Sequence, residues 1–390
     1  MPKNYNIVID RRKIKEDELK DTHVSADEMK KIIKDTMSRI KDTMDTRKFS
    51  RWMKERGITK DLRRMIVRVC NDENDAYLKN NPTVGGYASS NSIAPINKKG
   101  LIKGYNVHGD KSITLREKKN EQKGYNMYTA VHEFLHVISY SGKMRFDTFM
   151  NEGLTQYITE LIKGEIEQDN GYRYNVAIVE RLHNILGDKL IKAYFTGNPI
   201  EIEHNIIGLL GSKEKTIEFF NDLNESDDNR NIKFLMEKKK ENPEIKLSKY
   251  GQEYAKYDDY TPEQVENELK QIDERKQRVV STLHTLAIAK MREKFQNYEF
   301  YKDGQLDLTL IKKSINNLIN SEYKMLVDIG MEATFNDTSA NNICQEVNTM
   351  IAKYTHVRYG KTPDEIGKIY KLGFQFTEQH RVINSLKRNN

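Results

Sequence analysis

The chain has 390 residues, of which 37% are hydrophobic and 32% charged, and its 65 lysines and arginines exceed its 58 aspartates and glutamates to give a net charge of +7. The apolar residues are grouped, which excludes a disordered polypeptide, and so small an excess of positive charge over this length argues against nucleic-acid binding. The two cysteines, Cys70 and Cys344, are too few for a disulfide framework or for a zinc site built on cysteine.

The N-terminal sequence contains no apolar core of the kind found in signal peptides. No stretch of the chain approaches the roughly 18 apolar residues that span a membrane. We therefore expect a cytoplasmic protein without a membrane span, and export by a non-classical route is the alternative. The oligomeric state does not follow from the sequence.

The first predicted elements are helices. Ser25 and Glu28 form a capping-box pattern, and the apolar residues that follow recur at steps of three and four, which marks one face of a helix. A second helical stretch is expected around Ile66 and Val69. Together these patterns predict a helical N-terminal region over residues 1–82.

Glycines punctuate the next part of the chain, and short apolar runs at Ser92–Ile96 and Ser112–Leu115 lie between them. Such runs predict short strands in a small sheet. Helical spacing returns further along, so residues 83–223 form the expected central domain of sheet and helices. The expected helices of this domain cover residues 128–140, 149–163, 174–195 and 213–223.

A polar stretch from Asn224 to Arg230 is the expected boundary to a helical C-terminal region over residues 224–390. Thr261, with Pro262 after it, is typical of a helix start, and Thr362 before a second proline predicts another. The expected fold class is α+β: mainly helical with a small sheet, and with helical regions on both sides of the central domain.

One five-residue motif carries the chemistry of the central domain: His132-Glu133-Phe134-Leu135-His136, or H-E-x-x-H. Residues four apart lie on one face of a helix, so both imidazoles can bind the same metal ion. Glu133 lies about 100° further round the helix than His132, where it can reach a water on that metal without binding the metal itself. We therefore expect His132 and His136 as metal ligands and Glu133 as a general base.

A third ligand is expected from Asn151-Glu152-Gly153. Catalytic zinc sites use three protein ligands and leave one position for water. Fifteen residues separate His136 from Glu152, which allows one helix to end, the chain to turn back, and a second antiparallel helix to present Glu152. The expected cofactor is one Zn²⁺ per chain, bound by His132, His136 and Glu152.

The combination of H-E-x-x-H with a downstream N-E-G and an aromatic residue, Tyr157, resembles the gluzincin zinc metallopeptidases, the class of thermolysin and the M1 aminopeptidases. The resemblance covers roughly residues 83–200 and implies a zincin-like catalytic domain that hydrolyses a peptide or protein substrate. In thermolysin-like enzymes an acid four residues after the ligand Glu orients a zinc-bound His, and here Gln156 stands at that position. The G-x-M-E-N signature of the M1 exopeptidases is absent from the sequence, so we expect an endopeptidase.

The expected mechanism is metal-assisted amide hydrolysis, in which Glu133 takes a proton from a zinc-activated water and passes it to the leaving amine. A Tyr or His donor usually helps to stabilise the oxyanion, and Tyr172 and Tyr174 are the candidates. Two alternatives stay open at this point. One is a metal-stabilised, non-catalytic binding or regulatory module, and the other is a peptidase that acts as a delivered effector or toxin.

Overall fold

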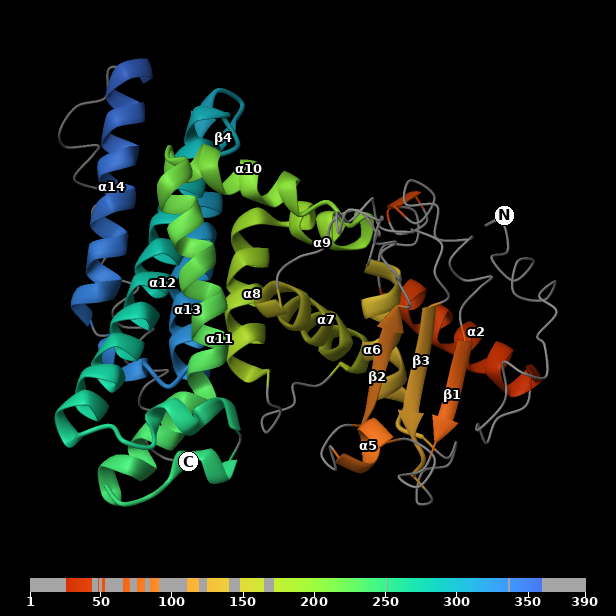
Figure 1. The fold of residues 1–390 in the computed structure, drawn as a ribbon. Coiled ribbons are helices and arrows are strands. Elements are labelled where there is room, and N and C mark those ends of the chain that lie inside the picture. The colour runs from red at the N-terminus through yellow and green to blue at the C-terminus, as the bar shows by residue number, and fades with distance from the viewer. Residues whose placement is uncertain are drawn as a thin grey trace, which may run out of the picture. The chain divides into compact units, whose positions relative to one another are not determined.

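The computed structural model describes residues 26–43, 48, 51–52, 66–70, 76–80, 85–90, 111–118, 125–139, 148–164, 172–250, 252–335 and 337–359. This part of the chain is mostly helical with a small sheet, which confirms the expected mainly helical α+β class (Figure 1). None of its helices is long and apolar enough to cross a membrane. Two compact units make up the chain, one of residues 1–179 and 188–202 and the other of residues 180–187 and 203–390. The expected division after residues 82 and 223 stays a prediction.

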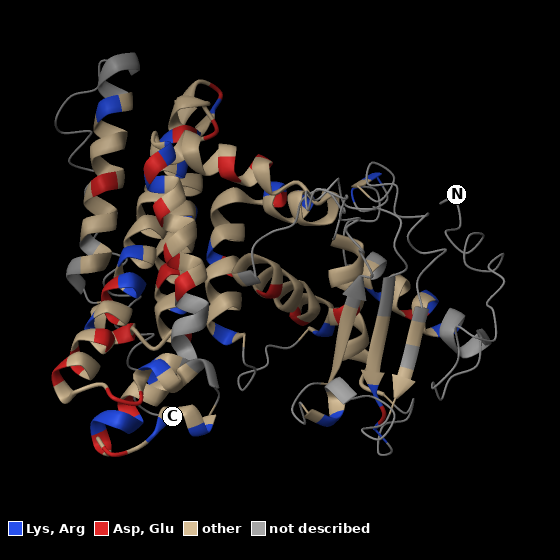
Figure 2. Cartoon of the chain, viewed as in Figure 1, with Lys and Arg blue, Asp and Glu red and all other residues tan. Residues whose placement is uncertain are grey.

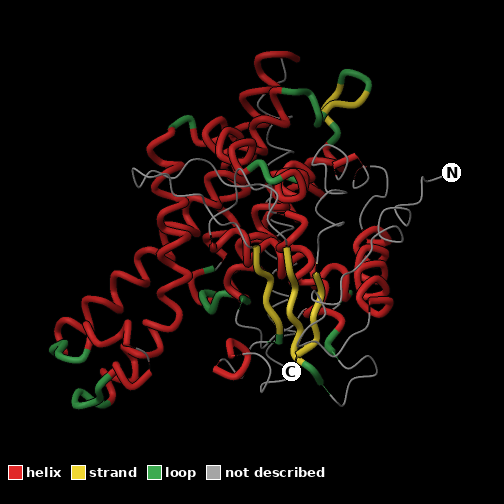
Figure 3. Tube along the Cα trace, turned by 45° about the vertical axis from the view of Figure 1, so that its right-hand side comes forward, coloured by secondary structure: helices red, strands yellow, loops and turns green. Residues whose placement is uncertain are grey.

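The first unit contains a sheet of three strands in the order β1, β3, β2, drawn in yellow in Figure 3. β1 spans Ile66–Cys70, β2 spans Gly86–Ser90 and β3 spans Lys111–Arg116. β1 runs parallel to β3, and β2 runs antiparallel to β3 with Ala88 opposite Ile113. Within the described residues, β2 therefore forms one edge of the sheet.

The helix expected around Ile66 and Val69 is wrong, because this segment is strand β1. Val67 and Val69 are buried, so the apolar positions here alternate with the period of a strand. β-Branched side chains also favour the extended backbone. The strand expected at Ser112–Leu115 is confirmed by β3, whereas the one expected at Ser92–Ile96 lies outside the described residues.

Helices cover this sheet and carry the residues of interest. α2 (Ala26–Thr43) packs against β1, and α6 (Met127–Ser139) packs against β2 and β3. α7 (Thr148–Lys163) packs against α6, and α9 (Asp188–Thr196) packs against both. These helices confirm the periodic patterns in the sequence, and one short helix, α5 (Ala76–Asn80), follows β1.

The single helix expected over residues 174–195 is wrong in one respect, because it is broken at Gly187. α8 (Arg173–Leu186) ends there, and α9 starts at Asp188. Gly187 has a φ of +63° and its amide donates to the carbonyl oxygen of His183 at 2.7 Å. A left-handed residue of this kind ends a helix, and glycine adopts it at little cost.

Long helices dominate the second unit, and Figure 2 shows charges of both signs interspersed along them. α10 (Pro199–Leu210) leads into α11 (Lys213–Glu241), which packs along α12 (Pro262–Gln296). α13 (Leu308–Asp328) and α14 (Asp337–Tyr359) complete the bundle. The connections contain η2 (Leu247–Tyr250), η3 (Gln252–Tyr257), η4 (Glu332–Thr334), β4 (Tyr301–Lys302) and β5 (Gln305–Leu306).

The polar stretch from Asn224 to Arg230 was expected to end a helix and is instead part of α11. No proline or glycine interrupts residues 213–241. α12 supplies partners at the start of this stretch: Asp222, just before it, pairs with Arg278 at 2.7 Å, and Glu225, within it, pairs with Arg275 at 2.8 Å. A polar helix is stable when such contacts replace an apolar face.

The helix start expected at Thr261 is confirmed. The Thr261 side chain accepts a hydrogen bond from the Gln264 amide, and the Gln264 side chain accepts one from the Thr261 amide at 2.9 Å. The start expected at Thr362 lies outside the described residues. Cys70 and Cys344 are both buried and unbridged, as their isolation in the sequence indicates.

Candidate metal centre

Helix α6 holds both histidines of the H-E-x-x-H motif. Asn126 caps its start, because the Asn126 side-chain oxygen accepts hydrogen bonds from the amides of Tyr128 at 2.9 Å and Thr129 at 3.1 Å. His132 and Glu133 are only 9% and 7% exposed. Buried polar side chains cost free energy unless they are paired, so their partners determine what this helix can do.

Helix α7 presents Glu152, and the glycine after it permits a close helix contact. A Cβ atom on Gly153 would lie 2.8 Å from Cγ2 of Val179 and 3.1 Å from the carbonyl oxygen of Asn175, both in α8. These distances are too short for ordinary van der Waals contact, so only glycine lets α8 lie this close to α7. The glycine of the N-E-G motif therefore has a packing role beside the carboxylate.

The three residues expected as ligands are brought together. Nε2 of His132 and Nε2 of His136 are 3.1 Å apart, and Oε2 of Glu152 lies 3.6 Å from the first and 3.4 Å from the second. Ligands that surround zinc tetrahedrally at about 2.0–2.1 Å lie roughly 3.3–3.4 Å from one another. The three atoms therefore have the spacing of ligands to one metal ion, and such a group could hold one.

The outer nitrogen of His132 is fixed by a buried relay along α7. Nδ1 of His132 lies 3.0 Å from Oε1 of Gln156, and Nε2 of Gln156 donates to Oε1 of Glu160 at 3.2 Å. A proton on Nδ1 makes His132 the donor to Gln156. The lone pair then stays on Nε2, the nitrogen on the side of Glu152, where it can bind a metal ion. Gln156 and Glu160 are both buried, so a carboxylate stands behind the amide that orients this imidazole.

The outer nitrogen of His136 contacts a second set of side chains. Oγ1 of Thr155 lies 3.2 Å from Nδ1 of His136, donates to the Asn151 carbonyl oxygen at 2.7 Å and lies 2.6 Å from the Tyr194 hydroxyl. Nδ2 of Asn151 is 3.0 Å from the same Nδ1, and a proton on Nδ1 that is donated to Thr155 requires the Asn151 amide oxygen to take the place of Nδ2. A hydroxyl can donate once and accept twice, so Thr155 accepts from His136 and Tyr194 while it donates to Asn151.

Sequence reasoning missed Thr155, Glu160 and Tyr194. The spacing of Asn151 to Thr155 and of Gln156 to Glu160 is four residues, which is the one signal that places such pairs on a shared helix face. Tyr194 comes from α9 and is fully buried. Its approach to α7 depends on tertiary packing, which no local pattern encodes.

We predict that Gln156→Leu lowers zinc affinity by roughly 10- to 100-fold, because His132 then loses the acceptor that orients it. The measurement is a competition titration against a fluorescent zinc chelator of known affinity. Gln271→Leu, at an exposed position of α12, is the matched control and should leave the affinity unchanged. Equal affinities for the Gln156 variant and the wild type would mean that this hydrogen bond does not position His132.

The pKa values of the two carboxyl groups of the site are shifted in opposite directions. Burial raises the pKa of Glu133 to about 7, the neighbouring Glu152 acts in the same direction, and His132 and the Ala88 amide, which donates to Glu133, oppose the rise. Burial also raises the pKa of Glu152, but hydrogen bonds and charge from both histidines outweigh it, so this pKa lies far below its usual value. Glu152 therefore stays ionised, as a metal ligand must, and Glu133 can exchange a proton near neutral pH.

The two tyrosines expected as oxyanion donors lie in different surroundings. The Tyr172 ring stacks on His132, with centroids 5.7 Å apart and an interplanar angle of 26°. Tyr174 is 5% exposed, and its ring meets Phe149 edge-on at 5.8 Å. The structure therefore brings Tyr172 to a candidate ligand and places the Tyr174 ring in the core, and the role of each as a donor stays a prediction.

Comparisons with known proteins identify no relative. No protein-family model matches the chain, and no match is found among curated proteins or solved structures. What the chain does must therefore be inferred from the residues of its own site.

Proposed function

We propose that the chain is a zinc-dependent peptidase whose first unit contains a zincin-like catalytic domain. The observation that supports this most is the convergence of Nε2 of His132, Nε2 of His136 and Oε2 of Glu152, at separations of 3.1, 3.4 and 3.6 Å. Three protein ligands leave the fourth position of a tetrahedral ion open, which is the arrangement of catalytic rather than structural zinc sites. The buried Glu133 beside these ligands is not one of them and can serve as the base.

Zinc in such a site supplies Lewis acidity, which activates water and polarises a carbonyl group. The remaining steps belong to the chain's own residues. Glu133 accepts a proton from the attacking water and delivers it to the amine nitrogen as the C–N bond breaks. Gln156 and Thr155 hold the two imidazoles so that both Nε2 atoms face the same point.

The position of β2 favours a peptide as the substrate. α6, which carries Glu133, packs against this edge strand, and the Ala88 amide of β2 donates directly to the Glu133 carboxylate. No described strand pairs with the far edge of β2, so an extended peptide that paired there would pass beside the general base. Because a paired strand extends on both sides of the bond that is cut, we expect an endopeptidase.

The test is hydrolysis of a library of unblocked and end-blocked peptides by the full-length protein, with products identified by mass spectrometry. We expect cuts within peptides whose ends are blocked, loss of activity after treatment with 1,10-phenanthroline, and its return on addition of about one equivalent of Zn²⁺. Cleavage that survives removal of zinc contradicts the proposal. Zinc-loaded protein that leaves every peptide intact also contradicts it, and favours the metal-stabilised binding module.

A further inference from the structure

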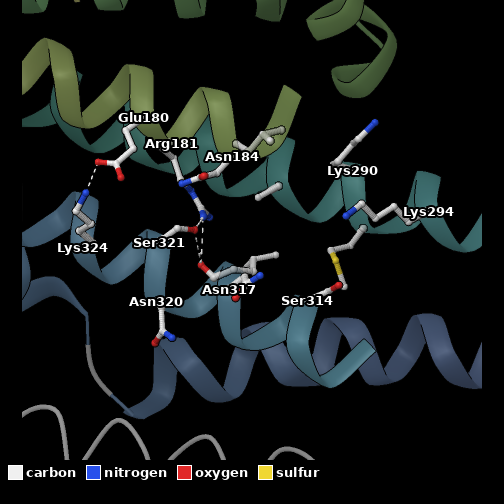
Figure 4. A pocket seen from close by; sticks show the side chains of 14 residues that line it. Glu180, Arg181, Asn184, Lys290, Lys294, Ser314, Asn317, Asn320, Ser321 and Lys324 are labelled. Carbon is white, nitrogen blue, oxygen red and sulfur yellow. Dashed lines mark hydrogen bonds and ion pairs between the residues drawn. The ribbon is translucent and has the colours of Figure 1, made fainter. Parts of the chain in front are cut away.

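A cavity of about 410 Å³ lies in the second unit, and none of its lining residues belongs to the candidate metal centre (Figure 4). Its wall comes from the end of α8, from α12 and from α13. In Figure 4, Arg181 and Asn184 of α8 lie above the space, and Ser314 and Asn317 of α13 lie below it. Cavities of roughly 300–1,000 Å³ between helices are typical of sites for small molecules.

Positive charge dominates the wall of this cavity. Four cations line it, Arg181, Lys290, Lys294 and Lys324, against the single carboxylate of Glu180. Three of the cations contact carboxylates: Lys324 pairs with Glu180, Lys290 with Glu293 at 2.6 Å and Arg181 with Glu322 at 2.9 Å.

Lys294 is the remaining cation, and in the described part of the chain it pairs with no carboxylate. Its ammonium lies 6.0 Å from the centroid of the Phe300 ring. The cavity therefore keeps one positive charge that no side chain of the described residues neutralises. The positive charge of Lys294 would attract an anion into the cavity.

The side chain of Arg181 in the cavity wall is buried and held by several hydrogen bonds. It is 2% exposed, and its guanidinium donates to Ser321, to the Leu318 carbonyl oxygen at 3.1 Å and to Glu322. Its Nε–H has no hydrogen-bond partner among the described residues. The hydrogen bonds to Ser321, Leu318 and Glu322 fix the guanidinium in place at the cavity wall.

The other lining groups indicate the chemistry of a ligand that would fit the cavity. Ammonium groups have three donors each and no acceptor, so Lys290 and Lys324 keep donors beyond the carboxylates that they contact. Asn184, Asn317 and Asn320 are the exposed asparagines among the lining residues. Ile185, Met291 and Leu318 supply an apolar part of the wall. The cavity thus combines excess donors, which suit an acceptor-only phosphoryl group, with room for a partly apolar body.

We propose that this cavity binds a small phosphorylated molecule, with the phosphoryl group at Lys294 and the rest of the molecule between the asparagines and the apolar wall. This site is separate from the proposed zinc peptidase activity and does not depend on it.

The experiment is isothermal titration calorimetry of the full-length protein with inorganic phosphate, pyrophosphate and adenosine monophosphate, in chloride buffers of matched ionic strength. We expect binding of about one molecule per chain for at least one of these probes. Lys294→Gln should weaken it by roughly 10-fold or more, because the unpaired charge is lost. Lys270→Gln, on the same helix with a side chain 73% exposed, should leave it unchanged.

A second variant guards against misfolding of the first. Asn317→Asp places a carboxylate at an exposed position of the cavity wall, where it should repel the probe and abolish binding. Asn316→Asp adds the same charge to the same helix but lies outside the cavity, so it should bind as the wild type does. The proposal would be overturned if none of the three probes binds, or if the Lys294 and Asn317 variants bind the probe with the affinity of the wild type.

Discussion

Glu133→Gln is expected to leave the protein folded and loaded with zinc while its peptidase activity falls by roughly 10²- to 10⁴-fold. Gln has the size of Glu but cannot accept a proton, so the change removes the base and little else. The Ala88 amide that donates to Glu133 can donate equally to the Gln carbonyl oxygen. The buried contacts of α6 are therefore kept.

The measurement pairs kcat/KM on a quenched fluorescent peptide with the zinc content of the same sample. Glu299→Gln, at an exposed position beyond the end of α12, is the matched control and should match the wild type in both. Two results would contradict the account. Wild-type activity in the Glu133 variant would remove its role as the base, and loss of zinc would mean that Glu133 is itself a ligand.

His136→Ala is expected to abolish stoichiometric zinc binding. It removes one of three ligands, whereas loss of a supporting hydrogen bond already costs about 10- to 100-fold in metal affinity. The loss should exceed that range, because His132 and Glu152 alone leave two positions of a tetrahedral ion without protein ligands. Activity on peptides should fall with the zinc content.

Zinc content is measured by inductively coupled plasma mass spectrometry after gel filtration, with circular dichroism to follow the fold. His204→Ala, at an exposed position of α10, is the control and should keep its zinc. If the His136 variant binds as much zinc as the wild type, the metal is held elsewhere and the assigned ligand set is wrong.

The geometry of the two histidines was accessible from the sequence because it is local. Positions four apart share a face on any helix, and residues 127–139 contain neither proline nor glycine. Glu152 was accessible only as an expectation, because its distance from His132 depends on how α7 returns against α6. Tyr194 was not accessible at all, since it reaches Thr155 across 39 residues.

The wrong predictions about the fold concern segments whose local sequence allows more than one structure. The run Ile66–Cys70 is short, and so short an apolar run is compatible with a helix or a strand until its neighbours are known. The break at Gly187 depends on one backbone dihedral that glycine permits but does not require. The stretch from Asn224 to Arg230 is polar enough for a linker, and it is helical because α11 packs along α12.

The most direct test of the zinc centre is X-ray absorption at the zinc edge, on full-length protein purified without added metal. We expect one zinc per chain, with nitrogen and oxygen ligands at about 2.0–2.1 Å that include two imidazoles. Protein without zinc, or zinc with sulfur ligands at about 2.3 Å, would contradict this expectation.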